Sequence, residues 1–197
     1  LGLLTAERTA LNLLGHLSGV ATATSHWADA IASTSAKVRD TRKTTPGMRA
    51  LEKYAVRCGG GVNHRMSLSD AALVKDNHIV AAGGVASAFA AVRKAAPAIV
   101  LEIEVDTIDQ LRTALTAGAD LVLLDNMKPE VLCEAVAIAT QHLASTGRAV
   151  VLEASGGLTL ENAQSVAATG VNYISVGALT HSAKVLDIGL DLETIVA

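Results

Sequence analysis

Aromatic residues are scarce in this 197-residue sequence, which holds only Trp27, Tyr54, Phe89 and Tyr173. Proteins that bind single-stranded nucleic acid stack successive bases on several aromatic side chains. The sequence therefore argues against such a platform, and we expect no nucleic acid partner.

Cysteine is equally scarce. Cys58 and Cys133 lie far apart and belong to no Cys-X-X-Cys pattern, the spacing typical of zinc ligands. We expect two ordinary buried thiols in a reducing, cytoplasmic environment rather than a disulfide.

An unbroken apolar run is missing too. The uncharged stretch 9–28 approaches the length of a membrane span. Polar residues interrupt it at Asn12, His16, Ser18, Thr22, Thr24, Ser25 and His26. We expect a helical packing surface there, with no membrane span and no signal peptide. The sequence begins at Leu1 rather than Met, as a piece of a longer protein would.

What is present suits one globular domain. Half of the residues are hydrophobic and 18% are charged, which supplies a sizeable core and excludes a mainly disordered chain or a coiled coil. Charge is unevenly distributed: residues 1–75 hold ten Lys and Arg against five Asp and Glu, whereas residues 76–197 hold six against fourteen. This split suits one site that binds both an anion and a metal, and it equally suits solvated helix faces.

Short apolar runs alternate with helix-like stretches from Lys37 onward. The predicted strands are 37–41, 71–76, 99–105, 121–125, 150–154 and 173–176. The predicted helices are 47–57, 85–96, 108–117, 130–143 and 160–168, preceded by helices alone in 3–33. Residues typical of helix boundaries support these ranges: Pro46 and Pro129 at starts, Gly118 and Gly170 at ends, Thr107 and Thr159 as caps.

Repeated βα units give a parallel sheet covered by helices. Because six strands fall short of the eight in a closed barrel, we predict an incomplete, open parallel α/β barrel, TIM-barrel-like, with N-terminal helices. A doubly wound sheet is the alternative. We expect a single domain, 1–197, with leading helices in 1–34, βα repeats in 35–184, and a tail in 185–197 that is a further strand or an excursion to a partner.

Polar residues gather at the carboxyl ends of the predicted strands, where α/β proteins place their sites. The strand ends read Arg39–Lys43, Lys75–His78, Glu102–Asp106, Leu124–Asn126, Glu153–Gly157 and Ser175–Gly177. Because strand interiors of a parallel sheet are buried on both faces, charge at so many strand ends indicates one functional rim.

The strand that carries Glu102, Glu104 and Asp106 gives the sharpest signal. Apolar residues alternate with these acids, so all three should share one face and point into the barrel. Buried like charges repel, and they need a cation beside them.

A magnesium site would supply that cation. Asp125 ends the next strand and should lie beside Glu104, and Mg²⁺ is commonly held by one or two carboxylates. The alternative is a structural ion network in which Glu104 and Asp125 pair with Lys75 and Arg39.

Two glycine motifs suggest a phosphate site. Ser155-Gly156-Gly157 lies between a strand and a helix, and Gly177-Ala178 follows the next strand. Glycines let backbone N–H groups approach an anion, and late βα loops of barrels often bind phosphate.

The basic part of the chain offers an anion site. Its candidate residues are Arg8, Arg42, Lys43, His64, Arg65 and Lys75. Gly59-Gly60-Gly61 is expected to form a flexible approach loop, although His64 alone would also suit a core position. Lys75 at a strand end is, in addition, a candidate Schiff-base nucleophile.

These motifs together resemble the quinolinate phosphoribosyltransferase family. The matching blocks are Thr41–Arg49, Leu51–Val56, Gly59–Arg65, Lys75–His78, Leu124–Asn126, Glu153–Gly157 and Ser175–Ser182. Their order and spacing match the family across essentially the whole chain. The resemblance implies an open barrel and a type II phosphoribosyltransferase.

The reaction implied by the resemblance joins quinolinate to 5-phosphoribosyl diphosphate with Mg²⁺. It releases CO₂ and diphosphate and gives nicotinate mononucleotide for NAD biosynthesis. The implied catalytic residues are Lys43, Lys75, Glu104 and Asp125, the last two near ribose and metal. The implied substrate contacts also include Arg8, Thr41, Arg42, His64, Arg65, Ser155, Gly156, Gly157, Val176, Gly177 and Ala178.

The family carries an N-terminal domain ahead of this region, and this sequence does not include it. The resemblance implies a homodimer or higher assembly with shared sites, in which Arg8 reaches the partner's site. The tail 187–191 resembles the segment that returns toward the N-terminal domain.

Two rival functions stay open. One is a Schiff-base aldolase that acts through Lys75 on a sugar phosphate. The other is a barrel without catalysis that binds anions or a partner chain.

Overall fold

The computed structural model describes residues 2–191, without the side chains of Leu3 and Leu4. Position 1 of the predicted leading helices lies outside the described residues. Positions 192–197 of the predicted tail also lie outside them.

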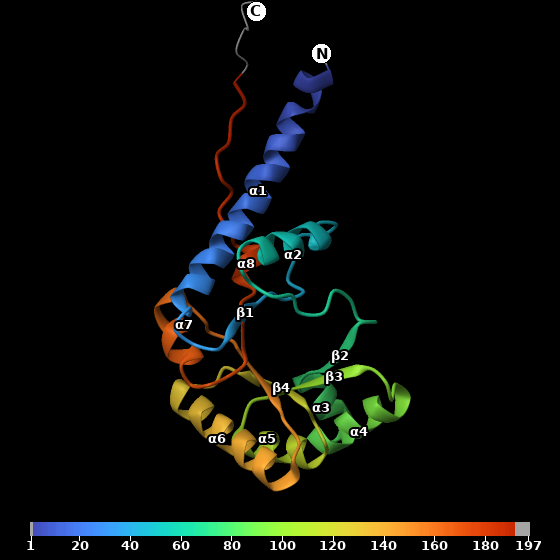
Figure 1. Ribbon diagram of the computed structural model, residues 1–197. Helices are drawn as coiled ribbons and strands as arrows, with labels where there is room; N and C mark the ends of the chain where they lie inside the picture. The colour runs from blue at the N-terminus through green and yellow to red at the C-terminus, as the bar shows by residue number, and fades with distance from the viewer. Residues whose placement is uncertain (1, 192–197) are drawn as a thin grey trace, which may run out of the picture.

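Six parallel strands form one curved sheet (Figure 1). They are β1 (Lys37–Arg39), β2 (Ala71–Val74), β3 (Val100–Val105), β4 (Leu121–Asp125), β5 (Val151–Ser155) and β6 (Tyr173–Ser175). The order is β1-β6-β5-β4-β3-β2, so β1 and β2 are the two edges. The open barrel is confirmed. The doubly wound alternative is wrong, because its strand order reverses at a switch point and this one runs without reversal.

Helices cover the outside of the sheet and extend beyond it. They are α1 (Gly2–Ala30), α2 (Arg49–Cys58), α3 (Asp76–Ala82), α4 (Val85–Ala95), α5 (Ile108–Thr116), α6 (Pro129–Thr146), α7 (Leu160–Ala167) and α8 (Ala178–His181). The long α1 replaces the several leading helices we expected. The short helices α3 and α8 were not predicted.

Helix boundaries follow local chemistry. The hydroxyls of Thr107 and Thr159 accept backbone hydrogen bonds at the starts of α5 and α7, as predicted. Gly118 and Gly170, with φ of +95° and +97°, end the turns that follow α5 and α7. Pro46 is the exception, because α2 begins only at Arg49.

The core lies between the sheet and its helices. Strand residues such as Ile103, Leu124 and Ile174 are fully buried there. Cys58 and Cys133 are free, but they are exposed rather than buried as we expected. None of the helices in residues 2–191 is long and apolar enough to cross a membrane.

The glycine run 59–61 is packed rather than flexible, so that expectation is wrong. A Cβ on Gly59 would lie 2.3 Å from the Ala21 carbonyl oxygen, and one on Gly61 would lie 2.8 Å from the Thr24 methyl group. These glycines let the loop approach α1 closely, and they position the residues that follow.

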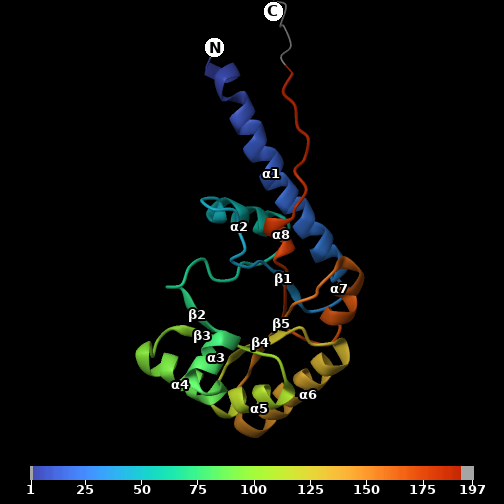
Figure 2. The ribbon, with the colours of Figure 1, turned by 180° about the vertical axis from the view of Figure 1, so that it is seen from behind.

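Helix α1 projects away from the barrel, and the chain segment after α8 runs back beside it (Figure 2). The Leu186 N–H donates a hydrogen bond to the Gly15 carbonyl at 3.1 Å. A Cβ on Gly19 would lie 2.0 Å from the Lys184 carbonyl oxygen. This contact depends on small residues along one side of α1. The described part of the predicted tail, 185–191, is therefore an excursion along α1 and not a further strand.

Candidate functional site

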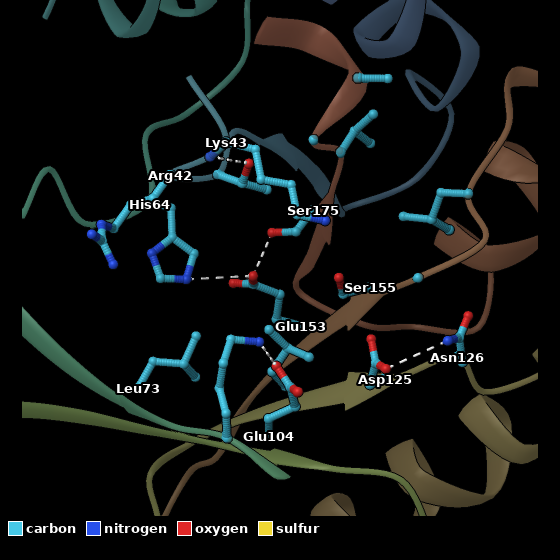
Figure 3. Close-up of a pocket in the computed structure, with 18 of the residues that line it drawn as sticks. Arg42, Lys43, His64, Leu73, Glu104, Asp125, Asn126, Glu153, Ser155 and Ser175 are labelled. Carbon is cyan, nitrogen blue, oxygen red and sulfur yellow. Dashed lines mark hydrogen bonds and ion pairs between the residues drawn. The ribbon is translucent and has the colours of Figure 1, made fainter. Parts of the chain in front are cut away.

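A cavity of about 570 Å³ opens at the carboxyl ends of the strands (Figure 3). Of the predicted site residues, these line it: Thr41, Arg42, Lys43, His64, Arg65, Lys75, Glu104, Asp125, Ser155, Gly156, Gly157, Val176, Gly177 and Ala178. The lining holds four further polar residues that were not predicted as ligand contacts: Asn126, Glu153, Ser175 and His181. The first three lie within strand-end motifs that were recognised in the sequence.

Buried Asp40 joins the two loops that supply the basic wall. Its carboxylate forms an ion pair with Lys53 and accepts hydrogen bonds from the His64 N–H at 2.7 Å and the Asn63 side-chain amide at 2.6 Å. Burial lowers the pKa of Lys53, while the Asp40 carboxylate opposes that shift. The loop after β1 and the loop after α2 are thereby fixed to one another.

Two further residues, Arg49 and Thr180, hold the loop after β1 by hydrogen bonds. The Arg49 side chain donates hydrogen bonds to Thr44 Oγ1 at 2.9 Å and to the Met66 carbonyl at 3.2 Å. The Thr180 hydroxyl of α8 donates to the Lys43 carbonyl at 2.7 Å. These contacts hold the backbone that presents Arg42 and Lys43 at the cavity.

Arg42 and Arg65 face the cavity as two neighbouring guanidinium groups. Burial and the charge of Arg42 lower the pKa of Arg65. Within residues 2–191 neither arginine has a carboxylate in ion-pair contact. Two unpaired guanidiniums in one place attract an anion, and their planar forks suit carboxylates or phosphates.

Lys75 and Glu104, which also line the cavity, form an ion pair. This pair bears out half of the structural ion network we considered. The other half differs, because Arg39 pairs with Glu153 and not with Asp125. The ion pair engages the Nζ atom that a Schiff-base nucleophile would need free.

Asp125 lies in an acidic corner of the rim. Burial raises its pKa, and the charges of Asp106 and Asp76 raise it further, against Lys75 and Lys43. Among the described residues, the only hydrogen bond to its carboxylate comes from the Asn126 side chain at 3.5 Å. Asp125 therefore retains free acceptor positions in a place with excess negative charge.

The glycines after β5 come close to the chain beside them. Gly156 has φ of +85°, and a Cβ there would lie 2.5 Å from Asn126 Oδ1. After β6, a Cβ on Gly177 would lie 3.1 Å from Lys43 Cδ. At both positions a side chain would crowd a neighbouring residue that lines the cavity.

A buried network lies beneath the basic wall. Glu153 pairs with Arg39. The Glu153 carboxylate also accepts a hydrogen bond from the Ser175 hydroxyl and lies 3.7 Å from His64 Nε2 (Figure 3). The same nitrogen of His64 lies 2.9 Å from Glu102 Oε2. Within residues 2–191, His64, Glu102 and Glu153 are the one group of three potential ligands close enough to share a metal ion. The guanidinium of Arg39 on Glu153 argues against a cation there.

The three acids on β3 differ in position. Glu102 and Glu104 are buried and point inward as predicted. Asp106 follows the end of the strand and is exposed, because β3 stops at Val105.

Arg8 lies outside this cavity. It is exposed on the projecting part of α1, beside a small hollow formed with Leu11, Asn12 and residues 185–188. Within one chain the structure does not bring Arg8 to the other predicted site residues.

Comparison with known proteins identifies the family. Residues 20–191 match the model for the C-terminal domain of quinolinate phosphoribosyl transferase. The nicotinate-nucleotide pyrophosphorylase (carboxylating) of Mycobacterium leprae is 56% identical over 191 residues, which is 97% of this chain and 66% of that protein. A probable one from Bacillus subtilis is 48% identical, over 96% of this chain and 64% of that protein.

Solved structures agree. The structure of the nicotinate-nucleotide pyrophosphorylase from Francisella tularensis has a TM-score of 0.87 and 46% identity, covering 94% of this chain and 64% of that one. The fold and cavity define an open-barrel α/β domain with a cavity at its rim that is lined partly by basic residues. This chain belongs to the quinolinate phosphoribosyl transferase C-terminal domain family. It spans just under two thirds of the length of these relatives.

Proposed function

We propose that this chain is the catalytic barrel of a phosphoribosyltransferase that joins quinolinate to 5-phosphoribosyl diphosphate and releases CO₂ and diphosphate. The product is nicotinate mononucleotide, a precursor of NAD. The observation that carries the proposal is the pair of unpaired guanidiniums, Arg42 and Arg65, which faces an acidic corner across one cavity. The carboxylating reaction in the relatives' names is the reverse of this one.

The basic wall would bind quinolinate. Arg42 and Arg65 present planar forks to its carboxylates, and Lys43 and Lys75 add positive charge beside them. The backbone around Gly156, Gly157 and Gly177 would accept the 5′-phosphate, since Cβ atoms are absent there. Thr41, Ser155, Val176 and Ala178 complete the lining on those sides.

The acidic corner suits Mg²⁺. Asp125 has free carboxylate oxygens among like charges, so a divalent cation would relieve the repulsion. Glu104 fits less well alone, because Lys75 already holds it. Bound there with the diphosphate, Mg²⁺ would neutralise the charge of the leaving group.

The residues of the chain then act by position and charge. As the C1–diphosphate bond breaks, the carboxylates of Glu104 and Asp125 stabilise the positive charge that develops on the ribose, and Lys43 stabilises the departing diphosphate. The quinolinate nitrogen attacks C1, so the ring becomes cationic. When the 2-carboxylate leaves as CO₂, the ring retains the electron pair, and C2 then takes a proton. No side chain needs to form a covalent bond to substrate.

Assembly belongs to the proposal. We propose a two-fold homodimer with shared sites, because α1 projects away from the barrel (Figure 1) and Arg8 lies beside residues 185–188 rather than in the lining of its own cavity. We also propose a cytoplasmic location, supported by two free and exposed thiols.

The direct test supplies quinolinate, 5-phosphoribosyl diphosphate and Mg²⁺ to this chain, and to a chain extended to the length of its relatives. We expect nicotinate mononucleotide and one CO₂ per product, measured by chromatography and ¹⁴CO₂ release. A product that still holds both carboxylates, or a borohydride-trapped imine on Lys75, would contradict the proposal. A longer chain that binds both substrates and releases nothing would support the non-catalytic barrel instead.

A further inference from the structure

His64 lines the cavity, but both of its ring nitrogens are engaged by the chain. Nδ1 accepts a hydrogen bond from the Arg65 backbone N–H at 2.7 Å, and Nε2 faces Glu102 Oε2 at 2.9 Å. A ring nitrogen that accepts a hydrogen bond carries no hydrogen, so the hydrogen of this imidazole resides on Nε2, the atom that lies 2.9 Å from the Glu102 carboxylate. The neighbour of this nitrogen is therefore a carboxylate of the chain itself.

Arg65 depends on this arrangement. Its backbone N–H is fixed on His64, and its guanidinium Nη1 donates to the Ala71 carbonyl at 2.6 Å. The guanidinium of Arg42 lies near enough to lower the pKa of Arg65. A side chain held beside a like charge needs a rigid support, because the repulsion favours its moving away.

Glu102 is the support behind His64. It is 1% exposed on β3, a strand paired with neighbours on both sides, and it does not line the cavity. Glu153 Oε1 also comes within 3.7 Å of Nε2, but Arg39 and Ser175 already occupy the oxygens of Glu153. Glu102 has one oxygen on His64, and its other oxygen is buried without a hydrogen-bond partner.

That unpartnered oxygen makes a glutamate at position 102 unfavourable for the stability of the fold. A buried acceptor without a donor loses its hydration and gains nothing in exchange. An apolar residue of similar size would fill the same space on β3 without this cost. Unlike such an apolar residue, Glu102 provides an acceptor for His64.

We propose that Glu102 is a positioning residue for the dicarboxylate end of the site, acting through His64 on Arg65. The inference rests on the proposed function, since it assigns the supported arginine to quinolinate. Glu102 holds the imidazole through the contact of its carboxylate with Nε2, the imidazole holds the Arg65 backbone, and the guanidinium is thereby aimed into the cavity. His64 then acts by position as well, through the two contacts of its ring.

The contact between Glu102 and His64 can be tested by enzyme kinetics on a chain extended to the length of its relatives. Glu102→Gln retains an oxygen acceptor for the imidazole, whereas Glu102→Met has similar size and no such acceptor. We expect Glu102→Met to raise KM for quinolinate about tenfold, equivalent to the loss of one hydrogen bond. We expect kcat, and KM for 5-phosphoribosyl diphosphate, to change less than about twofold, and Glu102→Gln to remain near the wild type. Equal effects on both substrates would overturn the proposal.

A second pair of variants separates the two bonds of the imidazole. The side-chain oxygen in His64→Asn can replace Nδ1 as the acceptor for Arg65, and the amide in His64→Gln can replace the Nε2–H toward Glu102. We expect His64→Asn to retain more quinolinate affinity than His64→Gln, because it keeps the bond that holds Arg65. The reverse order would contradict the proposed link.

The tautomer of His64 provides a readout that needs no activity. Nitrogen-15 NMR of the histidine-labelled 197-residue chain at neutral pH should show hydrogen on Nε2 and none on Nδ1. Hydrogen on Nδ1 would overturn the proposal whatever the activity. Failure of the wild type to bind quinolinate would instead overturn the proposed function and leave the tautomer result standing.

Discussion

Single residues at this site are set by contacts from elements far apart in the sequence. Arg65 is the best example, because hydrogen bonds with His64 and Ala71 fix its position, while burial and the charge of Arg42 lower its pKa. The geometry of the Arg65 guanidinium, as well as its charge, should therefore matter for substrate binding.

Arg65→Lys keeps the charge but removes the planar fork. We expect quinolinate affinity to fall by about 1.5–3 kcal/mol, the worth of a hydrogen bond to a charged group. Nicotinate, which lacks the second carboxylate, should bind poorly to the wild type. Isothermal titration measures both, and Arg112→Lys, an exposed arginine, is the control. Equal affinity of the wild type for nicotinate and quinolinate would rule out this pocket.

Asp125→Asn should weaken binding of 5-phosphoribosyl diphosphate in the presence of Mg²⁺ and leave quinolinate binding nearly unchanged. The same change should raise the melting temperature at neutral pH. The pKa of Asp125 is raised in the folded chain, so the ionised carboxylate destabilises the fold once the pH exceeds that raised pKa.

The gain in melting temperature should shrink as the pH falls toward the ordinary carboxyl value of 3.8, where the wild-type group is protonated in the folded chain. Scanning calorimetry across this range tests the sign, with exposed Asp187→Asn as the control. A melting temperature unchanged at neutral pH, together with unchanged diphosphate affinity, would remove Asp125 from the metal site.

At the scale of elements, α1 and the returning segment are held together by close packing. Gly19→Ala would place a methyl group 2.0 Å from the Lys184 carbonyl oxygen, so the segment must move. We expect a loss of about 1–3 kcal/mol, typical of overpacking, and faster proteolysis between residues 182 and 191. Gly2→Ala, in the same helix with open space around it, is the control. Equal protease resistance of Gly19→Ala and the wild type would contradict this packing.

Sequence patterns predicted the elements wherever the pattern was long. All six strands and five of the helices follow apolar runs and boundary residues, whereas α3 and α8 have seven and four residues and too little periodicity to detect. The site residues were found because parallel strands bring their carboxyl ends to one rim. The pairing of Arg39 with Glu153 could not be predicted, because only the β1–β6–β5 order brings them together. Close approach to α1, which explains Gly59 and Gly61, leaves no local signature either.

At the scale of the molecule, Arg8 is separated from the cavity that it would serve. If a second copy supplies it, two inactive variants should complement each other in a chain of the relatives' length. Mixing Arg8→Ala subunits with Lys75→Ala subunits should restore up to about a quarter of wild-type activity per subunit, since random pairing makes half the dimers mixed, each with one intact site. Activity assays after joint refolding measure this. Background activity in dimers shown to be mixed would mean that Arg8 does not act across subunits.

The edge position of β1 has a consequence for how the chain is made. Its hydrogen-bonded neighbour in the sheet is β6, with Lys37 opposite Tyr173, so β1 leaves the ribosome long before the strand that will hold it. The loop after β1 carries Arg42 and Lys43, and its backbone is tied to Thr180. The part of the proposed anion site that contains Arg42 and Lys43 therefore gains its contact with Thr180 only after the last part of the barrel has been synthesised. A nascent chain stalled before residue 173 should already contain the β2–β5 sheet, whereas β1, which then has its bridge to Val62 but no β6 beside it, should be more accessible to protease than in the complete chain.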